Sequence, residues 1–554
     1  MQLKKLIVAV ALSATAVVSQ AQSLGITCQT DAVLDNETVS KEIIDVNNKY
    51  VYSTSLKLTS INSPYDSDYN IYKYKKIKII VSDKTTLQEV VSKQIFGFKD
   101  NNAVDKDAIK KMTYHSMLVF DNTVVLFWCK TEKDKIEIYA QPFDEKLNTK
   151  IPIKKVFEFK KYDYPDFFIT KNVKAGNKIL IGSEFRKEEG DEVKIEYRVL
   201  NTNLAVEYSN QTILPYTKTK TDNTAWNTTK AITLEDNGLI YSNVYLTTKT
   251  DQTLISKESN VTSLLSIIDP STGKINSYTF KYKNKNSSKV KFFIQDDKTK
   301  VVGLYSDVEK SKYKQDFDGV FYTEINNNTA EISKPVFNEI DEKLKEEFFE
   351  YFKSKNIDEK QEEEEHNRID VYYSHFIDNS INFGIHKIEV VNDDNIVITA
   401  VKTIYTTSFP IQTNVVLLNV SGSGKIKWGK RIFRPENRTL TTLPKIKTIV
   451  DENKIYVFAT NFENIILKEQ CKPNKIPIKY KFIGFKETGY EVDYISIDRE
   501  TGKYNIQKLV INTENIVKKD RKLIILDNLV ELQNRIYFVT SDNYQKVGVI
   551  KPTN

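Results

Sequence analysis

The chain has 554 residues, of which 40% are hydrophobic, 28% are charged and 3 are cysteine. This composition excludes a disulfide-stapled miniprotein, a collagen-like repeat and a wholly disordered chain. The 81 Lys and Arg residues exceed the 74 Asp and Glu residues by only 7, a surplus too small and too evenly spread to predict nucleic-acid binding.

Residues 1–21 have the pattern of a secretory signal peptide. Lys4 and Lys5 precede an apolar run, residues 6–18, and residues 19–21 (Ser-Gln-Ala) have the small-x-small pattern of a cleavage site. The alternative is a membrane anchor, but the run is shorter than the roughly 20 residues that span a bilayer. We therefore expect a mature domain, residues 22–554, in a bacterial periplasm or outside the cell. Removal of the leader takes two lysines and no acid, so the net charge falls from +7 to +5. No later segment is apolar enough to predict a transmembrane span.

One strand–turn–strand unit recurs along the remaining chain. In each copy an apolar strand leads into a tight Asp or Asn turn, and a second, very apolar strand follows. The eight turns are at residues 45–48, 121–122, 177, 236–238, 296–297, 393–395, 451–453 and 534. A second hairpin follows seven of the copies, with turns near Asp83, Asp144, Asn201, Asp269, Asn326, Asn419 and Asp498.

Each unit therefore predicts four antiparallel strands, which we call A to D. Such a sheet cannot bury both faces alone, whereas about eight of them stacked around an axis can, so we expect an all-β fold with a single β-propeller. The eighth unit stops after its third strand, at residues 547–550, and residues 26–34 belong to no other unit. We expect residues 26–34 to close the ring as the outer strand of the last blade. A seven-bladed ring and a pair of stacked sandwich domains are the alternatives.

Two second hairpins share a turn sequence, Asp-x-x-Thr-Gly-Lys, at residues 269–274 and 498–503, and residues 419–428 carry a looser copy that ends in Trp428. This turn resembles the repeat of the quinoprotein-like (PQQ-like) β-propellers, in which a Trp follows the Gly by four positions. The layout is also similar to that of uncharacterised secreted propellers of Gram-negative bacteria. The resemblance implies a propeller fold. The vicinal cysteine pair of the quinoproteins is absent, so we expect no cofactor.

Five long segments fall on one predicted end of the blades. They are residues 58–73, 214–229, 248–260, 338–385 and 461–490. All of them are B–C or D–A connections, which share one end of an antiparallel blade, and long loops often serve binding. The insertion at 338–385 predicts a helix, capped by Asn338 with Asp341 three residues later. Its apolar stripe would comprise Ile340, Leu344, Phe348, Tyr351 and Phe352.

Aromatic residues in these loops are the candidate binding residues. We select Tyr69, Trp226, Phe409 and Phe462, because exposed rings suit stacking on sugars or contact with a protein. Tyr65, Tyr72, Tyr216 and Tyr480 have the same character.

Catalytic and metal motifs are nearly absent from the sequence. It has no His-Glu-x-x-His, no Gly-x-Ser-x-Gly and no phosphate-binding glycine loop. His366, His375 and His386 lie close in sequence, but their spacing matches no metal motif. The series Asp66-x-Asp68-x-Asn70 lacks the Gly and Glu of a calcium loop. We therefore expect no metal site. Among Cys28, Cys129 and Cys471 at most one pair can form a disulfide, and we expect Cys129 to be a buried thiol.

These patterns favour a secreted or periplasmic module that binds or scaffolds an envelope protein or an extracellular glycan. The alternative is a hydrolase or lyase that degrades polysaccharide or peptide with carboxylates at the central channel. A channel lined by converging charged side chains would favour the enzyme, and an apolar plug with an aromatic rim would favour the binder. The sequence leaves both possibilities open, with binding preferred.

Overall fold

The structure is a computed structural model. It describes residues 24–28, 40–58, 65–66, 71–72, 74–96, 112–160, 166–185, 192–217, 231–247, 261–287, 290–307, 317–341, 383–392, 395–405, 410–433, 446–451, 453–459, 490–511, 530–533, 535–539 and 547–552. The described residues contain strands, turns and short irregular links, and no helix.

The strands form eight antiparallel sheets, which we number as blades in chain order. Blade 1 consists of β2 (Ser40–Val46), β3 (Tyr50–Leu58), β6 (Tyr74–Asp83) and β7 (Glu89–Phe96). Blade 2 consists of β8 (Thr113–Val119), β9 (Val124–Thr131), β10 (Lys135–Phe143) and β11 (Lys154–Lys160). Blade 3 consists of β12 (Asp166–Asn172), β13 (Lys178–Phe185), β14 (Glu192–Asn201) and β15 (Val206–Thr217). Blade 4 consists of β16 (Ala231–Leu234), β17 (Ile240–Thr247), β18 (Val261–Ile268) and β19 (Ile275–Phe280).

The second half of the ring repeats this order. Blade 5 consists of β21 (Lys291–Gln295), β22 (Lys298–Asp307), β23 (Gly319–Asn326) and β24 (Val336–Glu339), and β20 (Lys285–Ser287) also pairs with β22. Blade 6 consists of β25 (Phe383–Asn392), β26 (Asn395–Tyr405), β27 (Pro410–Val420) and β28 (Ile426–Phe433). Blade 7 consists of β29 (Ile446–Val450), β30 (Lys454–Ala459), β31 (Tyr490–Asp498) and β32 (Tyr504–Ile511). Blade 8 consists of β33 (Val530–Leu532), β34 (Arg535–Val539), β35 (Val547–Pro552) and β1 (Leu24–Cys28).

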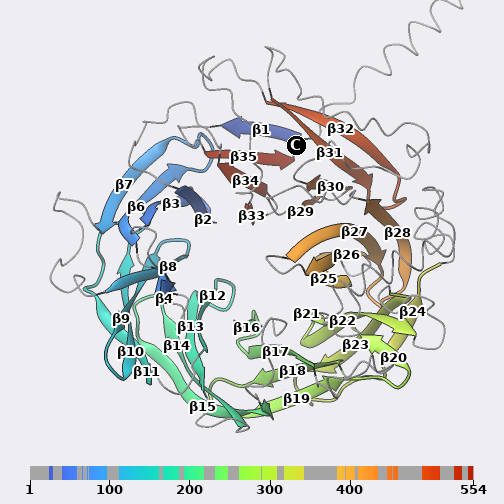
Figure 1. The fold of residues 1–554 in the computed structure, drawn as a ribbon, viewed down its shortest axis with the longest axis horizontal. Helices are drawn as coiled ribbons and strands as arrows, with labels where there is room; N and C mark the ends of the chain where they lie inside the picture. The colour runs from blue at the N-terminus through green and yellow to red at the C-terminus, as the bar shows by residue number, and fades with distance from the viewer. Residues whose placement is uncertain are drawn as a thin grey trace, which may run out of the picture.

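The eight blades stand around a central axis, with the first strand of each blade on the inside and the fourth on the outside (Figure 1). The predicted propeller of eight four-stranded blades is therefore confirmed. The alternatives of seven blades and of two sandwich domains are wrong. A small additional hairpin, β4 (Tyr65–Asp66) with β5 (Ile71–Tyr72), belongs to the connection that joins β3 to β6 in the sequence and forms a separate two-stranded sheet.

The two ends of the chain meet in blade 8. Strand β1 pairs with β35 in an antiparallel register that places Ile26 opposite Ile550. On the other side, Tyr537 and Val549 of blade 8 pack in one buried cluster with Ile43 and Val51 of blade 1. The strand predicted at residues 26–34 is thus found slightly earlier, at Leu24–Cys28, and residues 29–39 lie outside the described part of the chain.

Each sheet is apolar on both faces because each face packs against a different neighbour. In β9, Leu126 and Trp128 pack into the cluster shared with blade 1, whereas Phe127 and Cys129 pack into the cluster shared with blade 3. Successive side chains of a strand point to opposite faces, so a strand buried on both sides has an uninterrupted apolar run. The continuous runs in the sequence are the consequence of this arrangement.

The seven described C–D turns share two backbone features, although the donor lies three residues after the acceptor in three of them and four residues after it in the other four. In each turn one residue has a positive φ and its N–H donates to the backbone oxygen of the Asp, Asn or Ser that opens the turn. The seven residues are Leu87, Leu147, Leu204, Gly273, Ala330, Gly424 and Gly502. Where the residue is Leu, its side chain is fully buried in a cluster between blades, and this burial offsets the left-handed strain of about 1–2 kcal/mol.

A side chain from the outer strand of the preceding blade docks on several of these turns. Trp428 of β28 donates its Nε1–H to the Arg499 carbonyl oxygen at 2.7 Å. Asn210 donates to the Pro270 carbonyl at 2.7 Å, and Tyr278 donates to the Ala330 carbonyl at 3.0 Å. Trp428 is four residues after Gly424, the spacing that the sequence singled out. The outer strands of blades 3 and 4 make the corresponding contact with Asn210 and Tyr278, at slightly different positions.

Two local predictions differ from the structure. The turn of blade 6 begins at Ser421, because Asn419 is the penultimate residue of β27 and donates to the Arg499 carbonyl at 2.8 Å. Asn338 is a residue of strand β24, opposite Val320, and therefore does not cap a helix. Ile340 is buried between blades 5 and 6. The rest of the predicted helix, with Leu344, Phe348, Tyr351 and Phe352, lies outside the described residues.

Candidate functional site

The strand order places the long connections at one end of the ring. Residues 340–382 join β24, the last strand of blade 5, to β25, the first strand of blade 6. Residues 460–489 join β30 to β31, the second and third strands of blade 7. Both kinds of connection leave the same end of an antiparallel blade, which we call the B–C/D–A face. The first connection is shorter than the predicted 338–385, because Asn338, Glu339 and residues 383–385 are strand residues. The second is shifted by one residue from the predicted 461–490, because Tyr490 is the first residue of β31.

The four selected binding residues, Tyr69, Trp226, Phe409 and Phe462, lie outside the described residues, as does Tyr480. Tyr65 and Tyr72 are opposite each other in the β4–β5 hairpin. Tyr216, expected in a loop, is instead buried in β15, and its hydroxyl donates to the Glu184 carboxylate. The edge strand β15 continues past the predicted loop start at Leu214, and this extension carries Tyr216 into the core between blades 3 and 4.

The inner strands carry bulges that interrupt their regular pairing. In β25, Ile385 pairs with Ala400 and Lys387 with Thr399, so His386 is an extra residue without a partner in the ladder. In β8, Tyr114 pairs with Trp128 and Ser116 with Phe127, so His115 is the extra residue there. Bulges redirect side chains and are common beside functional sites. Two of the four histidines of the chain occupy such positions.

Basic side chains from three neighbouring blades gather around His386. Lys291 is the first residue of β21 in blade 5, Lys387 follows His386 in β25, and Lys447 is the second residue of β29 in blade 7. All four belong to inner strands: Lys291 and Lys447 lie where the D–A connections enter β21 and β29, and His386 and Lys387 are the fourth and fifth of the ten residues of β25. The cluster of Lys291, His386, Lys387 and Lys447 therefore lies at the B–C/D–A end of the channel, and we call it the channel-mouth cluster.

The electrostatics of the cluster are set by burial and by like charges. The pKa of His386 is lowered, first by burial and then by the positive charges of Lys447, Lys291 and Lys387. The imidazole is nevertheless exposed to solvent. Both observations hold for a group in a recess, where protein atoms surround the ring and water still reaches it. Burial also lowers the pKa of Lys291, so the local cost of positive charge extends to the neighbouring blade.

One carboxylate belongs to this region of the ring. Lys387 Nζ lies 2.5 Å from Glu389 Oε1 and donates to the Thr448 carbonyl of β29 at 3.5 Å. Burial raises the pKa of Glu389 and lowers that of Lys387, and the attraction between the two opposes both shifts. Glu389 Oε2 is buried without a hydrogen-bond partner. The pair thus fixes Lys387 between blades 6 and 7.

Near the opposite end of the inner strands, a polar tie joins blades 1, 2 and 3. Lys171, near the end of β12, forms an ion pair with Asp45 of β2 and donates to the Val119 carbonyl of β8 at 2.5 Å. Its charge is therefore matched within the ring. By contrast, His115 has no cation acting on it: burial alone lowers its pKa to about 4, and its ring lies 4.7 Å from that of Phe167. Of the two bulge histidines, only His386 has a charged environment.

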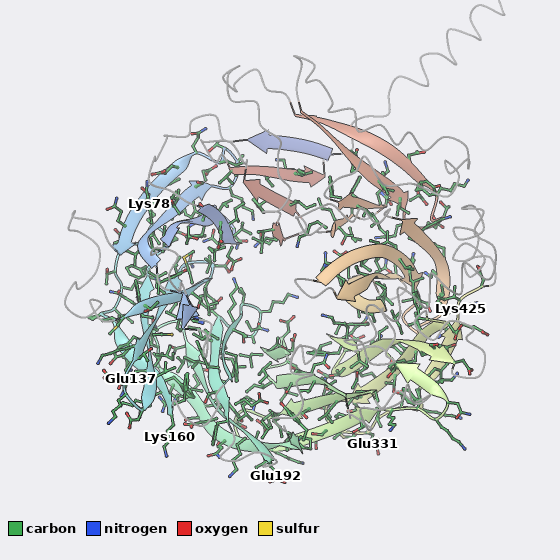
Figure 2. The ribbon with its side chains drawn as sticks, viewed as in Figure 1. Lys78, Glu137, Lys160, Glu192, Glu331 and Lys425 are labelled. Atoms are coloured by element: carbon green, nitrogen blue, oxygen red, sulfur yellow. The ribbon has the colours of Figure 1, made fainter. Side chains whose placement is uncertain are left out.

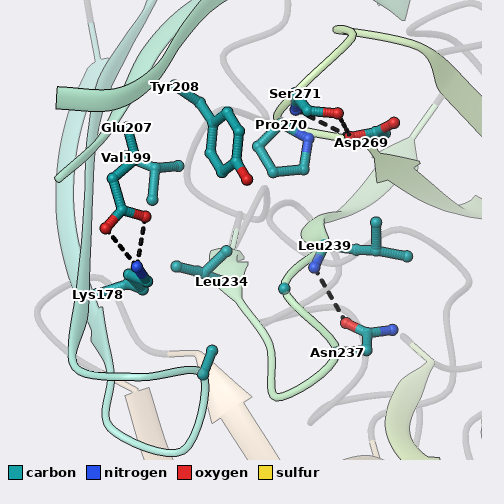
Figure 3. A pocket seen from close by; sticks show the side chains of 12 residues that line it. Lys178, Val199, Glu207, Tyr208, Leu234, Asn237, Leu239, Asp269, Pro270 and Ser271 are labelled. Atoms are coloured by element: carbon teal, nitrogen blue, oxygen red, sulfur yellow. Dashed lines mark hydrogen bonds and ion pairs between the residues drawn. The ribbon is translucent and has the colours of Figure 1, made fainter. Parts of the chain in front are cut away.

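A pocket of about 320 Å³ opens at the other face, between blades 3 and 4 (Figure 3). Leu234, Tyr208 and Pro270 form part of its wall. Several of its polar groups already have partners, because Lys178 pairs with Glu207 and Asp269 accepts from the Ser271 backbone N–H and hydroxyl. A ligand there would find few polar groups to satisfy, so the channel-mouth cluster is the better candidate site.

The periphery of the ring carries mixed charges. Figure 2 shows Glu137, Lys160 and Glu331 at its outer rim. Glu137 illustrates the pattern, since Lys135 and Lys155 both lie within 4 Å of its carboxylate oxygens. The charges of these pairs balance each other, whereas the charged groups that lower the pKa of His386 are all cationic.

The described residues contain no group of His, Cys, Asp and Glu side chains arranged for a metal ion. His366 and His375 lie outside the described part, and so does most of the Asp66–Asn70 segment. Cys129 is a buried free thiol, as predicted, and burial raises its pKa to about 12. In the described part of the chain there is no helix long and apolar enough to span a membrane.

No family model matches the chain, and no curated protein sequence matches it. Several solved structures are similar in fold. The WD40 domain of SCAP from fission yeast is 7% identical, with a TM-score of 0.39 over 96% of this chain and 99% of that one. The Nup133 β-propeller domain of Vanderwaltozyma polyspora is 11% identical, with a TM-score of 0.29 over 92% and 100%. A PL25 ulvan lyase, a polysaccharide lyase, is 9% identical, with a TM-score of 0.30 over 78% and 90%. These similarities are too distant to carry an argument about function.

Proposed function

We propose that the protein is a ring-shaped binding module that holds the anionic groups of an acidic glycan at the channel-mouth cluster. The observation that carries the proposal is the convergence of Lys291, His386 and Lys447 from three blades on one end of the channel. A carboxylate or sulfate placed among them would relieve the repulsion between the cations. It would also form charge-assisted hydrogen bonds, which are stronger than neutral ones.

The shape of the cluster favours a glycan over a flat protein surface. Its residues belong to the inner strands, so a ligand must reach into the ring rather than lie across its rim. A thin chain with charged substituents can do so, and the long B–C/D–A connections attach at the same end. An acidic protein segment is the other class of ligand, and a binding panel separates the two.

The alternative of a carboxylate-based hydrolase has less support. Glycosidases use two carboxyl groups on either side of the scissile bond. Among the described residues, the carboxylate of Glu389 contacts the channel-mouth cluster, and it is paired with Lys387. This arrangement suits the retention of an anion better than acid–base hydrolysis.

We also infer that the protein is exported and acts in the envelope or outside the cell. The support is the leader-like pattern of residues 1–21, and the first described strand, β1, begins just beyond it at Leu24. Cleavage after Ala21 would leave the closing strand in place. Cell fractionation with N-terminal sequencing tests this: a cytoplasmic protein that retains Met1 would contradict it. Kinship with quinoprotein-like propellers is likewise a proposal, supported by the docking of Trp428 on the turn that contains Gly502.

The binding function is tested with immobilised polysaccharides. We expect retention on sulfated or uronate-rich chains, no retention on neutral chains, and loss of retention in a Lys291→Gln, Lys447→Gln double variant. A matched control is Lys298→Gln, Lys425→Gln, which removes two exposed cations away from the channel. Equal retention by both double variants would refute the site, and selective retention on acidic peptides would replace the glycan by a protein ligand.

A further inference from the structure

His386 differs from its neighbours in the cluster because its charge can change near neutral pH. A lysine with an ordinary pKa is a cation throughout the physiological range, whereas an imidazole with an ordinary pKa titrates between about pH 5 and about pH 8. The bulge at His386 turns this residue out of the strand ladder, next to cations on β21, β25 and β29. The imidazole is therefore placed where the arrival of an anion changes its surroundings most.

We propose that the channel-mouth cluster binds its anion together with a proton, which is taken up by the His386 imidazole. The proposal rests on the proposed function, because it concerns the same site. In the empty site, burial and three cations disfavour the imidazolium. A bound anion reverses the dominant charge felt by the ring and supplies a hydrogen-bond acceptor for the added N–H. Anion and proton therefore bind cooperatively.

The charged side chains that act on His386, and the carboxylate paired with one of them, belong to three described strands. Lys291 lies on β21, Lys387 and Glu389 lie on β25, and Lys447 lies on β29. Glu389 is engaged with Lys387. Burial and these three cations all disfavour the imidazolium, so an added negative charge opposes their effect and favours the proton.

Linkage gives the size and sign of the effect. A group whose pKa rises on binding makes the affinity increase as the pH falls, by at most about tenfold per pH unit between the free and bound pKa values. The affinity levels off below the free pKa, where the imidazole is already charged, and above the bound pKa, where it stays neutral.

Isothermal titration calorimetry with inorganic sulfate tests the proposal, because sulfate keeps both charges between about pH 5 and about pH 8. Wild-type protein should bind more tightly as the pH falls, and the heat should depend on the ionisation enthalpy of the buffer. His386→Gln should remove both effects. His386→Arg carries a permanent charge in place of the imidazolium and should bind sulfate without pH dependence. The matched control is His115→Gln, which removes the other bulge histidine and should keep the wild-type slope.

The outcomes separate the two proposals. Absence of sulfate binding at every pH, or binding that survives the Lys291→Gln, Lys447→Gln double variant, overturns the proposed function and this inference with it. Binding that needs the lysines but is independent of pH overturns this inference alone. A wild-type slope that persists in His386→Gln also overturns it. Circular dichroism of each variant shows whether the ring is folded. If His386→Gln does not fold, His386→Arg still provides the test.

Discussion

The contact between Trp428 and Gly502 gives a sharp test of how adjacent blades are held together. Gly502 has φ +68°, and a Cβ placed on it would lie 2.9 Å from Trp428 Cδ2 and 3.1 Å from Trp428 Cγ. The Gly502→Ala substitution must therefore accept a left-handed alanine and displace the indole. Gly238 has φ +78° with no heavy atom within 4 Å of such a Cβ, so Gly238→Ala changes the backbone strain alone.

The expected magnitudes follow from these two situations. Gly238→Ala should cost about 1–2 kcal/mol of unfolding free energy, the strain of a left-handed residue with a side chain. Gly502→Ala should cost about 1.5–3.5 kcal/mol, because displacement of the indole also weakens its 2.7 Å hydrogen bond to the Arg499 carbonyl, worth about 0.5–1.5 kcal/mol. In a Trp428→Ala background the clash is gone, so the added cost of Gly502→Ala should fall to about 1–2 kcal/mol.

Urea denaturation followed by far-UV circular dichroism measures these differences in a double-mutant cycle. The Arg499 carbonyl keeps the Asn419 side-chain donor at 2.8 Å, so Trp428→Ala does not leave it unbonded. Equal costs for Gly502→Ala and Gly238→Ala in the wild-type background would refute the reasoning. So would a Gly502→Ala cost that is the same with and without Trp428.

Three further predictions concern other parts of the ring. The pKa of Glu137 is lowered to about 2, first by its hydrogen bond to Lys135, so the carboxylate stabilises the fold above its unfolded pKa and loses this effect as the pH falls towards 2. Glu137→Gln should therefore flatten the pH dependence of the melting temperature in this acidic range. An unchanged profile would count against the Glu137–Lys135 pair. Cys129, with its pKa raised to about 12 by burial, should resist alkylation at pH 8 until urea unfolds the protein, as peptide mass spectrometry would show, and rapid labelling of the native protein would contradict its burial. Ile26→Pro removes a backbone donor from β1 and should lower the unfolding free energy by at least about 1 kcal/mol, whereas an unchanged urea midpoint would argue against its pairing with β35.

The fold was accessible from the sequence because its determinants are local and repeated. The Asp and Asn residues that open the turns, such as Asp83 and Asp498, accept hydrogen bonds from backbone N–H groups two or three residues later. Apolar runs such as that of β9 reflect sheets buried on both faces. Both signals survive in a single sequence, and together they indicated the number and the order of the blades.

The candidate site was not accessible in the same way. Lys291, His386 and Lys447 are far apart in the sequence, and no sequence feature distinguishes the two lysines from the other Lys and Arg residues, 81 in all. A β-bulge has no clear sequence signature, so the sequence indicates neither a metal motif nor a binding role for His386. Asn338 shows the opposite error, because pairing with β23 overrides a local helical pattern. Tertiary contacts decide both cases. The order of the strands predicts only that the B–C and D–A connections share one end of the ring.

A crystal structure of the protein grown with selenate would test the central claim most directly, since the anomalous signal of selenium locates the anion without assumptions. The account predicts a peak at the channel mouth within hydrogen-bonding distance of the His386 imidazole and of the ammonium groups of Lys291 and Lys447. Selenate bound elsewhere on the ring, with no peak among these three side chains, would contradict it.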